Sequence, residues 1–371
     1  MSIFLRNGAC VIISRRINSH FTRVRIETFF RILAHDVLAI SFMNEFSPPD
    51  MSKGLAIMTS GGDSAGMNPA VKCCVEYARK QGYIPYLVYD GLRGLIDDHM
   101  VEATRELTSG ILHRGGTVLR SSRSKRFFEL QYRQQAYDNL QRRGIGQLIV
   151  IGGDGSFSAL NQFYNDFQVP FAGIPATIDN DIPGTDYCLG VDTALNMIRQ
   201  SVDSIRDTAT SFSRAFVIEV MGRHCGYLAM VSALSSGAEV CIIPELPYDL
   251  DSIGARLIEE KKNGRTYVLA IVAEGTRMSE HFTRWLSDSM KMDARLTVLG
   301  HVQRGGSPTV HDRIMAYKFS VAAVDSLKSG NTNAIMTFRD GTFGSVPIET
   351  VTSSKYRIDS DLLKLCEPLS R

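Results

Sequence analysis

The sequence predicts an α/β fold of two lobes, each with a mostly parallel sheet flanked by helices, and an active site in the cleft between the lobes. Two observations lead to this prediction. Short apolar runs such as "GLAIMT" and "LIVIGG" alternate with longer segments of helical periodicity, which is typical of parallel strands joined by crossover helices. The chain has 371 residues, and the number of such units suits two lobes.

The elements can be predicted in order from Gly54 onward. The apolar runs predict strands within 54–59, 84–91, 147–156, 170–175, 215–222, 239–245, 266–275 and 296–301. Helices are expected at 65–82, around 132–143, near 157–166, from 191 to 206, around 225–236 and 251–262, near 280–290 and from 309 to 328. The segment after residue 340 carries no motif with recognisable chemistry, and we expect a closing strand and a terminal helix there.

These elements divide the chain into three parts: an extension at 1–50, the two-lobed domain at 51–340 and a C-terminal segment at 341–371. The first 26 residues contain several arginines and no acidic residue. Such a start is typical of an organelle transit peptide. The alternative is upstream sequence wrongly joined to the gene, with Met43 or Met51 as the true start, and "SPPD" at 47–50 as a linker.

Composition excludes several classes of function. The formal net charge is +2, so no global basic field indicates nucleic-acid binding. The seven cysteines are scattered without a CxxC spacing, which favours free thiols in a reducing compartment, here the cytoplasm. No run of eighteen apolar residues predicts a membrane span.

A strand followed by Gly-Gly-Asp occurs twice, at 61–63 and at 152–154. Glycines at a strand end let backbone N–H groups approach a phosphate, and the N-terminus of the next helix favours an anion. Asp154 in "IGGDGS" suits Mg²⁺ on a nucleotide, because Mg²⁺ prefers a carboxylate together with phosphate oxygens. The alternatives are a tight turn at the first motif and a helix-capping aspartate at the second.

The loop "TIDND" gathers acidic residues directly after a predicted strand. Asp179 is placed to take a proton from an alcohol, and Asp181 would lie near the metal or change the pKa of Asp179 by like-charge proximity. Arginines stand near several other predicted strand and helix boundaries, where guanidinium groups fit phosphate oxygens. Phosphoryl transfer to a sugar alcohol needs such a base and such cations. The alternatives are an acidic turn and solvated surface charges.

Seven motifs together resemble the 6-phosphofructokinases, from about residue 54 to about 330: "TSGGDSAGMN", "GGTVLRSSR", "IGGDGS", "TIDNDIPGTDY", "VMGRHCGYLA", "AEGT" and "LGHVQRGGSP". The resemblance implies ATP-dependent phosphorylation of fructose 6-phosphate to fructose 1,6-bisphosphate, with Mg²⁺, in a homo-oligomer that is usually a tetramer. Arg214 and Arg295 match arginines that reach the 6-phosphate from a neighbouring subunit.

The resemblance also implies a role for each motif residue. Asp179 would be the base, with Asp181, Thr177, Arg123 and Arg223 as the other catalytic residues. The nucleotide would contact Gly62, Arg123, Ser124, Gly153, Asp154, Gly155 and Ser156, with Asp154 on the metal. The sugar phosphate would contact Thr177, Ile178, Asp179, Arg214, Met221, Gly222, Arg223, Glu274, Arg295, His301, Val302, Gln303 and Arg304.

Further comparison with the family concerns the phosphoryl donor and the effector site. Pyrophosphate-using relatives carry Asp and Lys where this chain has Gly155 and Ala176, and these small residues favour ATP. Ser124 and Arg120 depart from the family near the nucleotide. Arg105, Arg206, Glu239 and Arg265 match the charges of the bacterial effector site, whereas Lys72 and Glu76 depart from it.

Three alternatives remain. They are a pyrophosphate-dependent phosphofructokinase, a related kinase that acts on NAD or a lipid, and a sugar-phosphate-binding regulatory subunit.

Overall fold

The structure, a computed structural model, describes residues 3–6, 9–12 and 53–371. The chain separates into two compact units, Met1–Pro49 and Asp50–Arg371. In the first unit, β1 (Ile3–Arg6) pairs antiparallel with β2 (Ala9–Ile12). The expectations of a transit-like segment, of Met43 or Met51 as a start and of a linker at 47–50 fall mostly on residues outside the described ones.

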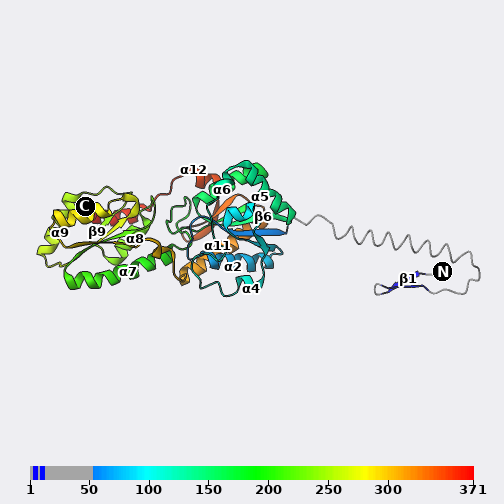
Figure 1. The fold of residues 1–371 in the computed structure, drawn as a ribbon, viewed down its shortest axis with the longest axis horizontal. Helices are drawn as coiled ribbons and strands as arrows, with labels where there is room; N and C mark the ends of the chain where they lie inside the picture. The colour runs from blue at the N-terminus through cyan, green and yellow to red at the C-terminus, as the bar shows by residue number, and fades with distance from the viewer. Residues whose placement is uncertain (1–2, 7–8, 13–52) are drawn as a thin grey trace, which may run out of the picture. The chain divides into compact units, whose positions relative to one another are not determined.

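The second unit contains a seven-stranded sheet and a four-stranded sheet, each flanked by helices (Figure 1). The larger sheet has the order β13-β12-β7-β6-β3-β4-β5, and the smaller has the order β11-β8-β10-β9. All neighbours are parallel except the edge strands β5 and β13. The predicted α/β class with two mostly parallel sheets is confirmed.

The strands of the larger sheet come from both ends of the second unit. They are β3 (Gly54–Thr59), β4 (Ile84–Val88), β5 (Met100–Glu102), β6 (Ile145–Gly152), β7 (Phe171–Pro175), β12 (Ala334–Arg339) and β13 (Thr342–Pro347). The smaller sheet lies between β7 and β12 in sequence, as β8 (Ala215–Val220), β9 (Val240–Ile242), β10 (Val268–Ala273) and β11 (Ala294–Val298).

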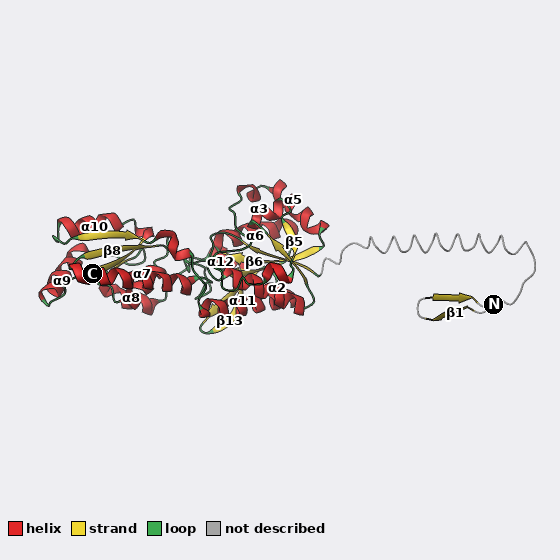
Figure 2. Ribbon diagram, turned by 60° about the horizontal axis from the view of Figure 1, so that its bottom comes forward, coloured by secondary structure: helices red, strands yellow, loops and turns green. Residues whose placement is uncertain are grey.

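The helices cover the faces of the sheets (Figure 2). They are α2 (Met67–Lys80), α3 (Gly91–Ile96), α4 (Arg105–Thr108), α5 (Leu130–Arg142), α6 (Asp154–Phe167), α7 (Val191–Phe212), α8 (Tyr227–Ser236), α9 (Leu250–Lys262), α10 (Ser279–Asp288), α11 (Val310–Lys328), α12 (Ile348–Ser353) and α13 (Ser360–Cys366). Four short 3₁₀ turns among the described residues complete the set: η1 (Lys125–Phe128), η2 (Glu274–Thr276), η3 (Gly300–Arg304) and η4 (Glu367–Leu369).

Strand β3 is apolar along its length because helices cover both faces of the sheet there. Successive side chains of a strand point to opposite faces of the sheet. Leu55 and Ile57 lie in the core that includes residues of α2 and α11, whereas Ala56 and Met58 lie in the core that includes residues of α5 and α6. Because both faces are covered, all six residues of β3 are buried, and an alternating pattern would not suit this strand.

Two helix boundaries differ from those predicted, and two strands were not predicted at all. Helix α7 continues to Phe212 instead of ending near residue 206, and α6 begins at Asp154 instead of 157. The last turns of α7 are mostly polar, so hydrophobic periodicity gives no signal there, and the helix ends where Ser213 adopts φ 52°. Strands β5 and β12 were not predicted, and β5 has only three residues.

The C-terminal segment contains the expected closing strand, β13, and a terminal helix, α13, with α12 between them. Helix α12 packs against α6, α13 packs against α8, and η4 contacts β9. The segment therefore runs from the seven-stranded sheet to the four-stranded one. Across the described part of the chain, no helix is both long enough and apolar enough to span a membrane.

Candidate active site

The site is a cavity of about 460 Å³ at the carboxyl ends of β3, β6 and β7, which are neighbours in the larger sheet. Open α/β sheets bind ligands at this end of their strands. Arg223, which follows β8 of the smaller sheet, and Arg304 of η3 also line the cavity. The predicted residues that line it are Gly62, Arg123, Ser124, Gly153, Asp154, Gly155, Ser156, Thr177, Asp179, Asp181, Arg223 and Arg304.

The two glycine motifs meet at one side of this cavity. The Ser156 hydroxyl lies 2.8 Å from the Ser60 hydroxyl, which ties the start of α6 to the loop after β3. A side chain at Gly152 would overlap the Ser60 carbonyl oxygen, and one at Gly62 would crowd the Arg304 guanidinium. Helix α6 begins at Asp154, and Asp154, Gly155 and Ser156 of its first turn line the cavity. The N-terminus of a helix is where phosphates bind.

Asp179 lines the cavity and is 2% exposed. Its backbone N–H donates to Thr177 Oγ1 at 3.2 Å, whereas its Oδ1 has no hydrogen-bond partner among the described residues. Burial, and then the negative charge of Asp181, raise the pKa of Asp179 from 3.8 to about 6. A carboxylate with a free oxygen and a pKa close to neutrality is suited to accept a proton from an alcohol.

The loop that carries the aspartates is fixed at two points. Asn180 is fully buried with φ 51°, and its side chain accepts from the Cys188 N–H at 2.9 Å and donates to the Asp186 carbonyl at 3.0 Å. At the end of the loop, the buried Asp312 of α11 accepts from the Gly190 N–H at 2.6 Å, and it also accepts from the Thr193 N–H and the Tyr187 hydroxyl. These hydrogen bonds hold the loop against α7 and α11.

Arg223 faces the aspartates from the smaller sheet. Its Nε lies 4.0 Å from Asp179 Oδ2, and its guanidinium charge lowers the raised pKa of Asp181, for which burial is the main cause. The residue has φ 54°, a sparsely populated conformation for a side chain of this size. Glu274 Oε1 accepts from the N–H groups of Gly222 at 3.2 Å and of Arg223 at 2.8 Å and so holds the backbone in this conformation.

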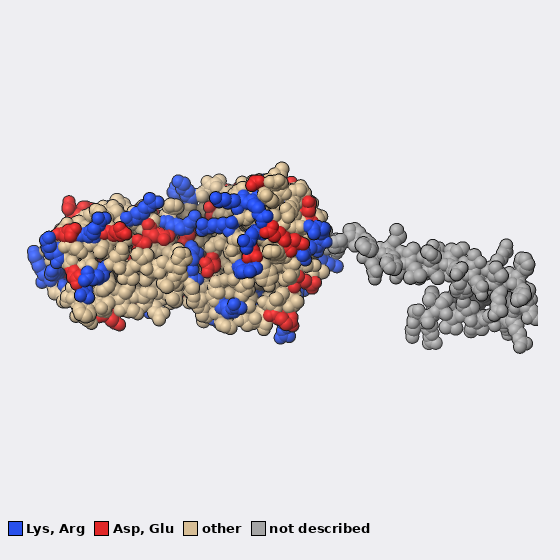
Figure 3. All heavy atoms as spheres, viewed as in Figure 1, with Lys and Arg blue, Asp and Glu red and all other residues tan. Residues whose placement is uncertain are grey.

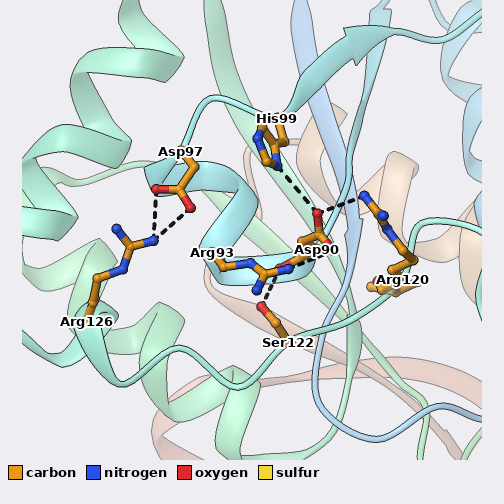
Figure 4. Close-up of polar contacts among 8 residues, drawn as sticks. Asp90, Arg93, Asp97, His99, Arg120, Ser122 and Arg126 are labelled. Carbon is orange, nitrogen blue, oxygen red and sulfur yellow. Dashed lines mark hydrogen bonds and ion pairs between the residues drawn. The ribbon is translucent and has the colours of Figure 1, made fainter.

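The loop that carries Arg123 is fastened to α3 (Figure 4). The backbone carbonyl of the buried Asp90 accepts from the Ser122 hydroxyl at 2.6 Å, and its carboxylate pairs with Arg120 at 2.9 Å and with Arg93 at 3.1 Å. Arg120 adopts φ 58°. The departure at Arg120 noted in the sequence therefore adds a contact that holds the loop carrying Arg123.

Several predicted residues lie beside the cavity rather than in its lining. Met221, Gly222, Glu274 and Gln303 form a wall behind Arg223, in which Gln303 Oε1 accepts from the Met221 N–H at 3.2 Å. His301 and Val302 are exposed on η3. Ile178 is fully buried in the core, so its side chain is unavailable to a substrate.

Arg214 and Arg295 are not brought to this cavity. Both pair with Asp293, at 2.6 Å and 2.9 Å, and Arg214 lines a separate hollow at the amino ends of β8 and β10. Within one chain the two arginines are therefore apart from the aspartates.

Of the residues that match the effector site, Arg265 pairs with Glu239, and Arg206 donates to the Ser236 carbonyl. The two departures from that site, Lys72 and Glu76, pair with each other.

Sequence reasoning missed part of the cavity. The lining also contains Ser60, Gly61, Leu92, Ser122, Lys125, Phe128 and Ala159. Ser60 and Gly61 belong to the first glycine motif and could have been named from it. Leu92, Phe128 and Ala159 lie on three different elements and carry no motif of their own, so only the fold brings them together.

A magnesium ion fits the carboxylates of this cavity together with a nucleotide. No cluster of three or more potential ligands of the His, Cys, Asp or Glu type occurs in the described segments. Asp154 and Asp181 both line the cavity, and the charge of Asp154 contributes to the raised pKa of Asp181. Mg²⁺ is commonly bound by one or two carboxylates and by phosphate oxygens, so this donor set suits it.

Residues 54–327 match the phosphofructokinase family. The chain belongs to this family. A relative from a Sulfurovum species, an ATP-dependent 6-phosphofructokinase, is 53% identical over 314 residues, which cover 84% of this chain and 96% of the relative. The ATP-dependent 6-phosphofructokinase of Thermotoga petrophila is 42% identical over 318 residues, which cover 86% of this chain and all of the relative.

Solved phosphofructokinase structures share the fold. The chain matches phosphofructokinase from Saccharomyces cerevisiae with a TM-score of 0.77 at 29% identity, covering 81% of this chain and 45% of that one. It therefore spans about half the length of the yeast phosphofructokinase. A pyrophosphate-dependent phosphofructokinase from Marinobacter aquaeolei matches with a TM-score of 0.74 at 20% identity, covering 85% of this chain and 91% of that one. The latter likeness concerns the fold alone.

Proposed function

We propose that the chain is an ATP-dependent 6-phosphofructokinase, which transfers the γ-phosphoryl group of ATP to O1 of fructose 6-phosphate in glycolysis. The observation that carries this proposal is Asp179, buried between the glycine motifs and Arg223 with an unpaired carboxylate oxygen and a pKa of about 6. The names of the relatives support both the donor and the acceptor.

Each residue of the cavity has its own role in the reaction. Asp179 accepts the proton of the sugar hydroxyl as the new O–P bond forms. Arg223, 4.0 Å from it, stabilises the negative charge that spreads over the transferred phosphoryl group. The N–H groups at the start of α6 and the Arg123 guanidinium bind the nucleotide phosphates. Asp154, with Asp181 near it, would hold Mg²⁺, which would supply positive charge to neutralise the phosphate oxygens.

The sugar phosphate is assigned to the wall formed by Met221, Gly222, Glu274 and Gln303, together with Thr177, His301, Val302 and Arg304. Two further contacts come from a neighbouring subunit in this proposal. Arg214 and Arg295 lie away from the cavity of their own chain, which supports a role in the cavity of a partner. We accordingly propose a homo-oligomer, with a tetramer as the expected form, acting in the cytoplasm.

The space around the nucleotide phosphates favours ATP over pyrophosphate as donor. A Cβ at Gly155 would have nothing within 4 Å, and Ala176 lines the cavity with a small side chain. An aspartate at 155 and a lysine at 176 would place larger charged groups in this space. Pyrophosphate, the alternative donor considered from the sequence, is the second candidate, and the small residues Gly155 and Ala176 argue against it.

The test is donor choice. The full chain, purified, is incubated with fructose 6-phosphate and Mg²⁺, and fructose 1,6-bisphosphate is measured with ATP and with pyrophosphate. We expect product from ATP alone. Product from pyrophosphate alone would overturn the donor assignment and leave the base in place. Binding of fructose 6-phosphate without product from either donor would instead identify a regulatory subunit.

A further inference from the structure

Arg123 lines the cavity, but no other side chain holds its guanidinium in place. Among the residues that the structure describes, none forms a hydrogen bond or an ion pair with the Arg123 side chain. The exposed side chain is thus available to a phosphate, and its position depends on the backbone that carries it. The contacts of residues 119–122, directly before it, therefore decide where Arg123 lies.

The buried Asp90 holds residues 119–122 through both its backbone and its side chain (Figure 4). Its N–H donates to the Leu119 carbonyl at 2.9 Å, and its carbonyl accepts from the Ser122 hydroxyl at 2.6 Å. Its carboxylate pairs with Arg120 at 2.9 Å. Asp90 directly precedes α3, so these three contacts fasten the backbone before Arg123 to the start of that helix.

The same residues are also joined to β3 and to the first glycine motif. The Thr59 hydroxyl, at the end of β3, donates to the Arg120 carbonyl at 2.9 Å. The Ser121 hydroxyl donates to the Gly61 carbonyl at 2.7 Å. Because Gly61 lines the cavity, these bonds fix residues 119–122 relative to the glycine motif there.

Arg120 is the residue of this stretch whose conformation needs support. It adopts φ 58° and Asp90 adopts φ 61°, both in the left-handed region that residues other than glycine disfavour. Side chains of both charges lie close together on the face of the second unit in Figure 3, so an exposed arginine readily finds a carboxylate. Arg120 differs because the carboxylate of its partner is only 6% exposed, and such a pair is screened less by solvent and salt.

We propose that Arg120 is a positioning residue for Arg123: its ion pair with Asp90 holds residues 119–122 so that the Arg123 guanidinium faces the nucleotide phosphates. This inference rests on the proposed function, in which Arg123 binds those phosphates. Arg120 does not line the cavity, so its effect on a nucleotide passes through the loop. A loop fixed before binding loses less conformational entropy when the ligand binds, and the gain is measured as affinity.

The test is a double-mutant cycle measured by ATP binding. Calorimetric titration of the full chain with ATP and Mg²⁺, without sugar phosphate, gives the Kd of wild type, Arg120→Gly, Arg123→Ala and the double variant. We expect Arg120→Gly to raise the Kd about threefold, as the loss of a partly exposed ion pair predicts. Arg123→Ala should raise it about tenfold, because a guanidinium contact to phosphate is lost. The double variant should lie within about 1.5-fold of Arg123→Ala, because Arg120 then has no guanidinium to position.

Glycine is the suitable replacement at 120, because it accepts φ 58° and removes only the ion pair. The urea midpoint of Arg120→Gly should therefore stay close to that of wild type. Arg93→Ala is the matched control. Arg93 pairs with the same carboxylate at 3.1 Å, but it lies on α3 and does not line the cavity. Each single variant leaves Asp90 one arginine partner, and Arg93→Ala should keep the Kd of ATP within about 1.5-fold of wild type.

An unchanged Kd in Arg120→Gly, or an equal rise in Arg93→Ala, would overturn the inference. So would additive losses in the double variant, since Arg120 would then act independently of Arg123. A wild-type chain that binds no ATP would overturn both the inference and the proposed function. A wild-type chain that binds ATP and gives the expected cycle, but forms no fructose 1,6-bisphosphate from it, would refute the proposed function alone, so the two failures can be told apart.

Discussion

Asp179→Asn is expected to make the protein more stable while removing its activity. A rise in the pKa of Asp179 from 3.8 to about 6 means that the folded state disfavours the ionised carboxylate, and the shift corresponds to about 3 kcal/mol. The penalty is absent below pH 3.8, where folded and unfolded chains are both protonated. It grows as the pH rises and is complete above about pH 6. Asparagine carries no charge and so avoids it.

Urea-induced unfolding measures this effect when wild type and variant are compared at the same protein concentration. We expect Asp179→Asn to raise the free energy of unfolding by about 3 kcal/mol at pH 7.5 and by about half as much at pH 5.0. Asp138→Asn, on the exposed face of α5, should change it by less than about 0.5 kcal/mol at either pH. A gain that does not depend on pH, or a loss of stability at pH 7.5, would refute the assignment of a buried, unfavourable charge at Asp179.

Three further outcomes can be measured. In a pH profile of kcat/KM for fructose 6-phosphate, the acid limb should fall near pH 6 and move to lower pH in Asp181→Asn, because Asp181 raises the pKa of Asp179. An acid limb at the same pH in wild type and variant would show that Asp181 does not raise the pKa of Asp179. Gly275→Ala should lower kcat at least tenfold, since its methyl group would overlap the Arg223 carbonyl oxygen; unchanged steady-state kinetics would show that Arg223 tolerates displacement. Asp312→Ala should lower the free energy of unfolding by about 3 kcal/mol, because buried donors lose their acceptor; a urea midpoint equal to wild type would contradict this.

The part of the cavity lined by Asp154 and Asp179 was predictable because it lies in short contiguous motifs. "IGGDGS" and "TIDND" follow apolar strands that are buried on both faces, and a parallel sheet brings the ends of neighbouring strands together. Burial of the loop after β7 then raises the pKa of Asp179, which sequence can suggest only through the nearby Asp181. The separation of Arg214 from the cavity depends on the length and direction of α7, whose polar last turns carry no periodic signal.

The apolar end of the cavity, which includes Phe128, could not be predicted in the same way. Phe127 and Phe128 are adjacent and chemically identical, yet one is buried and the other is 60% exposed. The difference arises from Arg133, Asp166 and Phe163, which lie on α5 and α6. No local pattern distinguishes the two rings, because the outcome depends on contacts made by residues further along the chain.

The order of the strands has a consequence for how the protein is made. The four-stranded sheet is built from one continuous stretch, residues 215–298. The seven-stranded sheet cannot be completed until β12 has been synthesised, because β12 pairs with β7 across some 160 residues. While the chain emerges from the ribosome, the smaller lobe can close first, and β7 is left as an open hydrogen-bonding edge until residues 334–339 appear. An unpaired edge of buried, apolar residues invites association with other chains. Stalled or shortened products that end before β12 are therefore expected to aggregate, even though they contain every residue assigned here to the catalytic cavity.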